Sequence, residues 1–133
     1  MELKDILKEI ESFSPSAAGI VRERKRQIDE EHFSADHDSH HLENELVLAA
    51  ICYANPERRL VRKANGDNSY PNIPTVQKTA KDGTVETYML FPASLWPFGL
   101  EDWKPTPDDR ARELEKAAAL LAAERDRIIN TKK

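Results

Sequence analysis

The fold depends most on residues 39–54, SHHLENELVLAAICYA, which predict a helix with a long apolar stretch. Its apolar residues recur at helical spacing, and Asn55-Pro56 would end it. The residues expected to be buried are Leu42, Leu46, Ala49, Ala50 and Tyr53. The pattern therefore indicates a buried helix with a polar, histidine-rich start.

Three more helices are predicted around this one. The first covers residues 2–12, the second runs from about Pro15 to about Glu31 behind a Ser14 cap, and the last runs from Thr106-Pro107 to about Ile129. The inward faces are expected to carry Ala17, Ile20, Val21 and Ile28 in the second helix, and Leu114, Ala117, Ala118, Leu121 and Ile128 in the last.

Residues 56–94 are predicted to form an insertion between the third and the last helix. Residues 56–74 are polar and rich in turn formers, and two β-prone runs, 75–78 and 84–90, flank Lys81-Asp82-Gly83. We therefore expect one mainly α domain over residues 1–133, with about four helices packed as a small bundle and a β-hairpin insertion.

Composition narrows the class of protein. At 133 residues the chain is long enough for one domain with its own core, and its net charge of −4 argues against general nucleic-acid binding. Cys52 is the only cysteine, so no intramolecular disulfide can form. No apolar run approaches the roughly 18 residues of a membrane span. These features predict a cytoplasmic protein that does not enter a membrane.

The four histidines of the chain fall within ten residues, at positions 32, 37, 40 and 41. His37, His41 and Glu45 are spaced four apart, but on a helix the first and third would lie about 12 Å apart, too far for one metal ion. His41 and Glu45 remain a ligand pair, with Glu124 as a third ligand from the last helix. Because no thiolate joins them, the window predicts the wall of a pocket rather than a metal centre.

Magnesium stays an alternative cofactor. The all-α nucleoside triphosphate pyrophosphohydrolases hold it with Glu-x-x-Glu and Glu-x-x-Asp pairs. This chain has Glu43-x-Glu45, Glu113-x-Glu115 and Glu124-x-Asp126, and acids two apart lie on different sides of a helix. A magnesium-dependent hydrolase using Glu45 and Glu124 is therefore kept as the alternative to a protein without a cofactor.

Three charged residues, Arg24, Glu45 and Glu124, fall on apolar helix stripes. A buried charge is expected to be paired, because an uncompensated one costs several kcal/mol. Two interpretations stay open: an internal Arg24–Glu45 or Arg24–Glu124 ion pair, or a polar pocket between helices.

Aromatic residues supply a second set of candidates. Trp96 and Trp103 bracket Pro97-Phe98-Gly99, and Lys104 follows. The two indoles would either cover the end of the bundle or stack on a nucleotide base. In the second case Arg22, Arg24 or Arg26 would meet the phosphate.

Two stretches carry a family resemblance. Residues 26–54 contain Arg26-Gln27, His37-Asp38 and His41 followed by Glu45-Leu46, and residues 95–127 contain Trp96-Pro97 and Trp103-Lys104-Pro105. These residues resemble a family of small proteins encoded by tailed phages and prophages, which usually have no assigned function. The family typically reads Arg-Gln-x-x-x-Glu-Gly-Trp-Thr-x-Glu-His-Asp-Asp-x-His, where this chain has His32, Phe33 and Ser39 in place of glycine, tryptophan and the second aspartate. The resemblance implies a phage context, in which small accessory proteins bind a host defence component or sequester a nucleotide signal.

Together these patterns predict a phage-type accessory protein that binds a small anionic, nucleotide-derived ligand. The expected ligand-binding residues are Arg22, Arg24, Arg26, His37, Asp38, His41, Glu45, Trp96, Trp103 and Lys104. No catalytic residue is predicted, and a homo-oligomer in the host cytoplasm is expected to enclose the ligand. The alternatives are the magnesium-dependent nucleotide pyrophosphohydrolase and a protein-binding inhibitor of a host factor.

Overall fold

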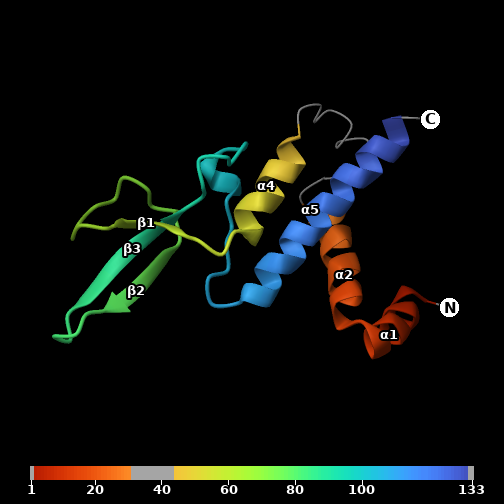
Figure 1. The fold of residues 1–133 in the computed structure, drawn as a ribbon, viewed down its shortest axis with the longest axis horizontal. Coiled ribbons are helices and arrows are strands. Elements are labelled where there is room, and N and C mark those ends of the chain that lie inside the picture. The colour runs from red at the N-terminus through yellow and green to blue at the C-terminus, as the bar shows by residue number, and fades with distance from the viewer. Residues whose placement is uncertain (1, 31–43, 132–133) are drawn as a thin grey trace.

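The structure is a computed structural model that describes residues 2–30 and 44–131 (Figure 1). All four histidines therefore lie outside the described residues. The elements in chain order are α1 (Leu3–Phe13), α2 (Pro15–Glu30), α4 (Glu45–Ala54), β1 (Arg59–Arg62), β2 (Thr75–Thr79), β3 (Val85–Phe91), the 3-10 helix η1 (Leu100–Asp102) and α5 (Arg110–Thr131). Within these ranges, no helix combines the length and the apolar character needed to cross a bilayer.

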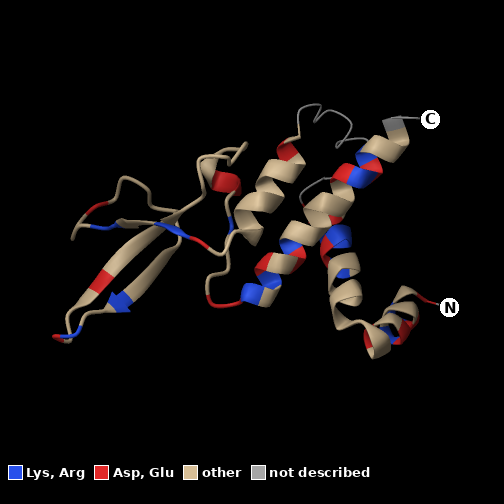
Figure 2. Ribbon diagram, in the orientation of Figure 1, with Lys and Arg blue, Asp and Glu red and all other residues tan. Residues whose placement is uncertain are grey.

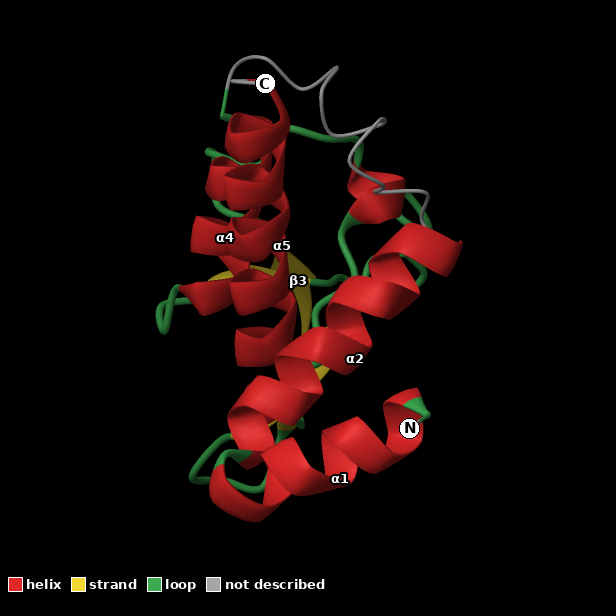
Figure 3. Ribbon diagram, turned by 90° about the vertical axis from the view of Figure 1, so that its right-hand side faces the viewer, coloured by secondary structure: helices red, strands yellow, loops and turns green. Residues whose placement is uncertain are grey.

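The described helices pack in series rather than as a closed bundle. α5 contacts both α2 and α4, whereas α1 contacts only α2. Figure 3 shows α1 lying across one end of α2, away from the α4–α5 pair. The expected four-helix bundle is therefore wrong, because α1 contacts neither α4 nor α5, and two of the four described α-helices contact only one other helix each.

The insertion is a three-stranded antiparallel sheet, so the expectation of a β-hairpin alone is also wrong. Its strand order is β1-β3-β2. β2 and β3 pair around a turn in which Gly83 has a φ of 87° and Asp82 Oδ1 accepts a hydrogen bond from the Thr84 N–H at 2.9 Å. β1, which lies in the stretch expected to be a loop, pairs with the other edge of β3 from Arg59↔Phe91 to Arg62↔Tyr88. The sheet extends away from the helices (Figure 1).

Helices and sheet share one hydrophobic core near the end of β3. The buried cluster includes Leu46 and Tyr53 of α4, Leu120 of α5, Met89 of β3 and Trp103. Trp103 stacks on Tyr53 at a centroid distance of 5.0 Å, and its Nε1–H donates to the Leu90 carbonyl at 3.0 Å. This indole therefore joins α4 to the sheet.

Two helix starts show how capping sets the boundaries. Ser14 Oγ accepts a hydrogen bond from the Ala17 N–H at 3.1 Å, which confirms the predicted cap of α2. α5 begins at Arg110 rather than at Pro107. Asp109 is its cap, because Asp109 Oδ1 accepts from the Arg112 N–H at 3.0 Å.

The buried face of α2 differs from the expected one. It consists of Ala18, Gly19, Glu23 and Gln27, while Val21 and Ile28 are partly exposed. Gly19 makes room for a side chain of α5, because a Cβ atom at this position would lie 2.5 Å from Glu115 Oε2. Small and polar side chains therefore make up the face of α2 that is buried against α5.

Candidate functional site

The three arginines expected to meet phosphate are held by carboxylates. Arg22 Nη2 lies 2.8 Å from Glu11 Oε2, and Arg24 Nε lies 3.5 Å from Asp126 Oδ2. Arg26 donates to both carboxylate oxygens of Glu23 at 2.8 Å. Their positive charges are therefore compensated by carboxylates of the same chain.

Glu23 is a buried acceptor that sequence reasoning missed. Its side chain takes hydrogen bonds from Arg26 and from Gln27, and Arg112 of α5 lies 2.6 Å from its Oε1. Burial acts to raise the pKa of Glu23, but the hydrogen bonds and charges of Arg26 and Arg112 outweigh it and hold the pKa below its ordinary value. The one sequence signal was Arg26 three residues away, on the same helix face.

Glu113 of α5 is the centre of a second buried network. It is 1% exposed, it pairs with Arg58 and Arg110, and its Oε2 accepts from the Thr106 N–H at 3.3 Å. Arg110 also donates to the carbonyls of Tyr53, at 2.8 Å, and Ala54. These contacts fix the carboxyl end of α4 to the start of α5.

The alternative metal site is only partly described. Glu45 is the first residue of α4, Glu124 pairs with Arg127, and His41 lies outside the described residues, as do His37 and Asp38. In residues 2–30 and 44–131 no group of three histidine, cysteine or acidic side chains is placed to hold a metal ion. Glu124 Oε2 is buried and has no hydrogen-bond partner in that part of the chain.

The expected aromatic and basic residues do not converge. Trp103 is 3% exposed and belongs to the core. The Lys104 N–H donates to the Tyr53 hydroxyl at 3.1 Å, so its backbone is anchored to α4. Because α5 lies between α4 and α2, these residues are separated from Arg22 and Arg26 (Figure 1).

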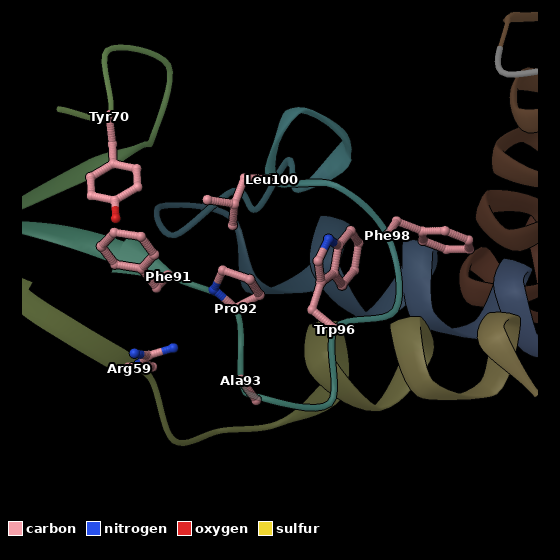
Figure 4. Close-up of a pocket in the computed structure, with 8 residues that line it drawn as sticks. All are labelled: Arg59, Tyr70, Phe91, Pro92, Ala93, Trp96, Phe98 and Leu100. Atoms are coloured by element: carbon pink, nitrogen blue, oxygen red, sulfur yellow. The ribbon is translucent and has the colours of Figure 1, made fainter.

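A pocket lies where β1 and β3 meet the segment that follows β3 (Figure 4). Its volume is about 310 Å³, and Trp96 is the one expected ligand-binding residue in its lining. The lining residues are Arg59, Tyr70, Phe91, Pro92, Ala93, Trp96, Phe98 and Leu100. Figure 4 shows Arg59, Tyr70 and Phe91 on one side of the pocket and Trp96 on the other.

Strand pairing places the cation of this pocket beside its aromatic rings. Arg59 opens β1 opposite Phe91, and its Cζ lies 5.6 Å from the centroid of that ring. Tyr70 contacts Phe91 edge-on at a centroid distance of 5.0 Å. The Trp96 Nε1–H is satisfied by the Gly99 carbonyl at 2.9 Å, which fixes the indole.

Arg59 differs from the arginines of α2 in its electrostatics. Among the residues that the structure describes, none of the ion pairs includes Arg59, although its neighbour Arg58 pairs with Glu113 and Arg62 pairs with Glu86. The pocket therefore offers aromatic surface and one uncompensated cation. This combination suits a small planar molecule with a negative charge.

Comparison with known proteins assigns no function to this pocket. No protein-family model matches the chain, and neither the curated proteins nor the solved structures gave a significant match. The functional argument therefore rests on the geometry of the pocket.

Proposed function

We propose that the protein binds a small planar anion, a mononucleotide in the simplest case, in the pocket between Arg59 and Trp96. The observation that carries the proposal is the uncompensated Arg59 in a cavity that four aromatic side chains line. The guanidinium would meet a phosphate, and the indole of Trp96 or the ring of Phe91 would pack against a base.

The size of the pocket suits a small ligand. A volume of about 310 Å³ is at the lower end of the roughly 300–1,000 Å³ of small-molecule sites, which is why a mononucleotide is the simplest candidate. The arginines of α2 would stay in their ion pairs. The proposal therefore moves the phosphate contact from Arg22, Arg24 and Arg26 to Arg59.

The resemblance to phage-encoded proteins supports a role for such a binder. A protein that holds a nucleotide signal in the host cytoplasm needs a pocket and no catalyst. We therefore favour sequestration of a nucleotide that the host uses in defence. The magnesium-dependent hydrolase becomes an outcome of the test below.

Calorimetric titration with nucleoside monophosphates and the matching nucleosides tests the proposal. The nucleotide should bind more tightly than its nucleoside in the presence of EDTA. Arg59→Ala should weaken nucleotide binding by about tenfold to a hundredfold, as expected for one charge-assisted hydrogen bond, and leave the nucleoside unaffected. Arg62→Ala is the matched control, because Arg62 lies on the same strand and pairs with Glu86 at 3.4 Å.

Three results would contradict the proposal. They are an absence of binding by every nucleotide, equal affinity of Arg59→Ala and the wild type, and equal affinity for nucleotide and nucleoside. Chromatography of the ligand after incubation gives a separate readout. Intact nucleotide supports a binder, whereas release of phosphate or pyrophosphate only with Mg²⁺ supports the hydrolase.

A further inference from the structure

The link between α4 and β1 is short and ends at the pocket. It covers residues 55–58, and Arg59, the cation of the pocket, follows it directly as the first residue of β1. Within the link, Asn55 Oδ1 accepts a hydrogen bond from the Glu57 N–H at 2.9 Å, which closes a tight turn. The place of the Arg59 backbone therefore depends on how this link is anchored.

One buried carboxylate anchors both ends of the link. Glu113 of α5 pairs through its Oε1 with Arg58, the last residue of the link. Glu113 also pairs with Arg110, and the Arg110 guanidinium donates to the carbonyl of Tyr53 at 2.8 Å and to that of Ala54. Figure 2 shows charged residues of both signs in the first turns of α5, beside the end of α4. The link therefore begins and ends on groups that Glu113 holds.

The two neighbouring arginines point to different partners. The described lining of the pocket includes Arg59 but not Arg58, which reaches Glu113 instead. The Arg59 Cζ lies 5.6 Å from the centroid of the Phe91 ring, its partner across the strands. Because consecutive side chains of an extended chain point to opposite sides, holding Arg58 on α5 leaves Arg59 directed at the pocket.

We propose that Glu113 and Arg58 are positioning residues, which hold the start of β1 so that the Arg59 guanidinium is placed for the anion before it binds. This inference rests on the proposed function of the pocket. A cation on a long side chain loses conformational freedom when it meets a ligand, and anchoring it beforehand lowers that cost. The buried ion pairs of α5 thus contribute to affinity at a pocket that they do not line.

Calorimetric titration of Arg58→Ala with a nucleoside monophosphate and its nucleoside tests the proposal. The variant should stay folded, because Glu113 keeps Arg110 and the Thr106 N–H as partners. It should bind the nucleotide about threefold to tenfold more weakly than the wild type, since Arg59 must then be ordered on binding, and the nucleoside equally well. Arg58→Lys retains a charged contact with Glu113 and should bind the nucleotide as the wild type does.

A double-mutant cycle separates positioning from a direct contact. In an Arg59→Ala background, Arg58→Ala should cause no further loss of nucleotide affinity, because the side chain that Arg58 positions is gone. Additive losses would overturn the proposal, since Arg58 would then act on the ligand independently of Arg59. Unchanged nucleotide affinity in Arg58→Ala, or an equal loss for nucleotide and nucleoside, would also overturn it. Arg62→Ala, at the other end of β1, is the matched control and should change neither affinity.

Nuclear magnetic resonance of the free protein keeps this inference distinct from the proposed function. The Arg59 Nε–H resonance, assigned by its absence from Arg59→Ala, should carry a ring-current shift from Phe91. Arg58→Ala should reduce this shift, whereas Arg58→Lys and Arg62→Ala should keep it. An unchanged resonance in Arg58→Ala overturns the positioning role. A wild type that binds no nucleotide overturns the proposed function, and a reduced shift in Arg58→Ala then still supports the positioning of Arg59.

Discussion

Among single residues, Glu23 should make the stability of the folded protein depend on pH in the acidic range. Its pKa is lower in the folded chain than the ordinary value, so the folded state favours the ionised form. That contribution is fully present above the ordinary glutamate pKa of about 4.3 and is lost as the pH falls further, through the lower folded-state pKa. The free energy of unfolding of the wild type, measured in urea at a series of pH values, should therefore decrease as the pH is lowered below about 4.3.

Glu23→Gln should remove this dependence and lower stability at neutral pH by about 2–3 kcal/mol, because Arg26 and Arg112 would lose the buried carboxylate that they share and would keep Glu30 and Glu115 as partners. The exposed Glu9→Gln is the control and should behave as the wild type does. A Glu23→Gln variant with unchanged neutral stability and an unchanged acid profile would contradict the assignment.

Cys52 should be chemically inert in the folded protein. It is 3% exposed, and burial raises the pKa of its thiol despite a backbone hydrogen bond at Ala93. Since the thiolate is the reactive form, the native protein should not react with a chromogenic disulfide at neutral pH, whereas the urea-unfolded protein should react fully. Rapid stoichiometric reaction of the native protein would show that the thiol is accessible.

The candidate site illustrates which single residues a sequence can and cannot identify. Trp96 stood out because it and Trp103 bracket Pro97-Phe98-Gly99, and it does line the pocket. Arg59 did not stand out, because its role depends on pairing with Phe91, 32 positions further along the chain. The arginines of α2 were conspicuous as a cluster, but the carboxylates that compensate them come partly from α1 and α5.

At the scale of elements, the attachment of α4 to α5 should depend on Arg110. Arg110 donates to the carbonyls of Tyr53 and Ala54, which have no partner within the helix, and it pairs with Glu113. Arg110→Ala should therefore lower the free energy of unfolding by about 2 kcal/mol. Hydrogen exchange should quicken first in the last turn of α4. Arg125→Ala is the control. Arg125 is exposed and lies on α5, as Arg110 does, and its substitution should change neither measurement.

Local sequence patterns predicted where helices and strands lie better than they predicted which of these elements contact one another. The start of α2 could be predicted, because a serine cap and a first-turn proline act within four residues. β1 could not, because its four residues, RLVR, alternate too little to stand out, and its strand character comes from the distant β3. The start of α5 was displaced by three residues because Asp109 competes with Thr106 as the cap.

At the scale of the whole molecule, periodicity identified apolar stripes but not what covers them. Val21 and Ile28 of α2, and Leu114 and Leu121 of α5, were expected in one core and are exposed. The face of α2 that is buried against α5 consists instead of Ala18, Gly19 and polar side chains, and Gly19 leaves room there for the Glu115 side chain. Periodicity therefore predicts which residues share a helix face, but not which of these faces the chain itself buries.

Cooperativity of the whole molecule should depend on Trp103. Trp103 is a main link between helices and sheet within the shared core, because its ring stacks on Tyr53 of α4 and its Nε1–H donates to the Leu90 carbonyl of β3. Trp103→Ala should lower the free energy of unfolding by about 3–5 kcal/mol. It should also separate the helical transition, followed by circular dichroism, from the fluorescence transition of Trp96. Trp103→Phe keeps a ring against Tyr53 and should lose less stability, with the two transitions still coincident. Coincident transitions at wild-type stability in Trp103→Ala would show that other contacts hold the sheet to the helices.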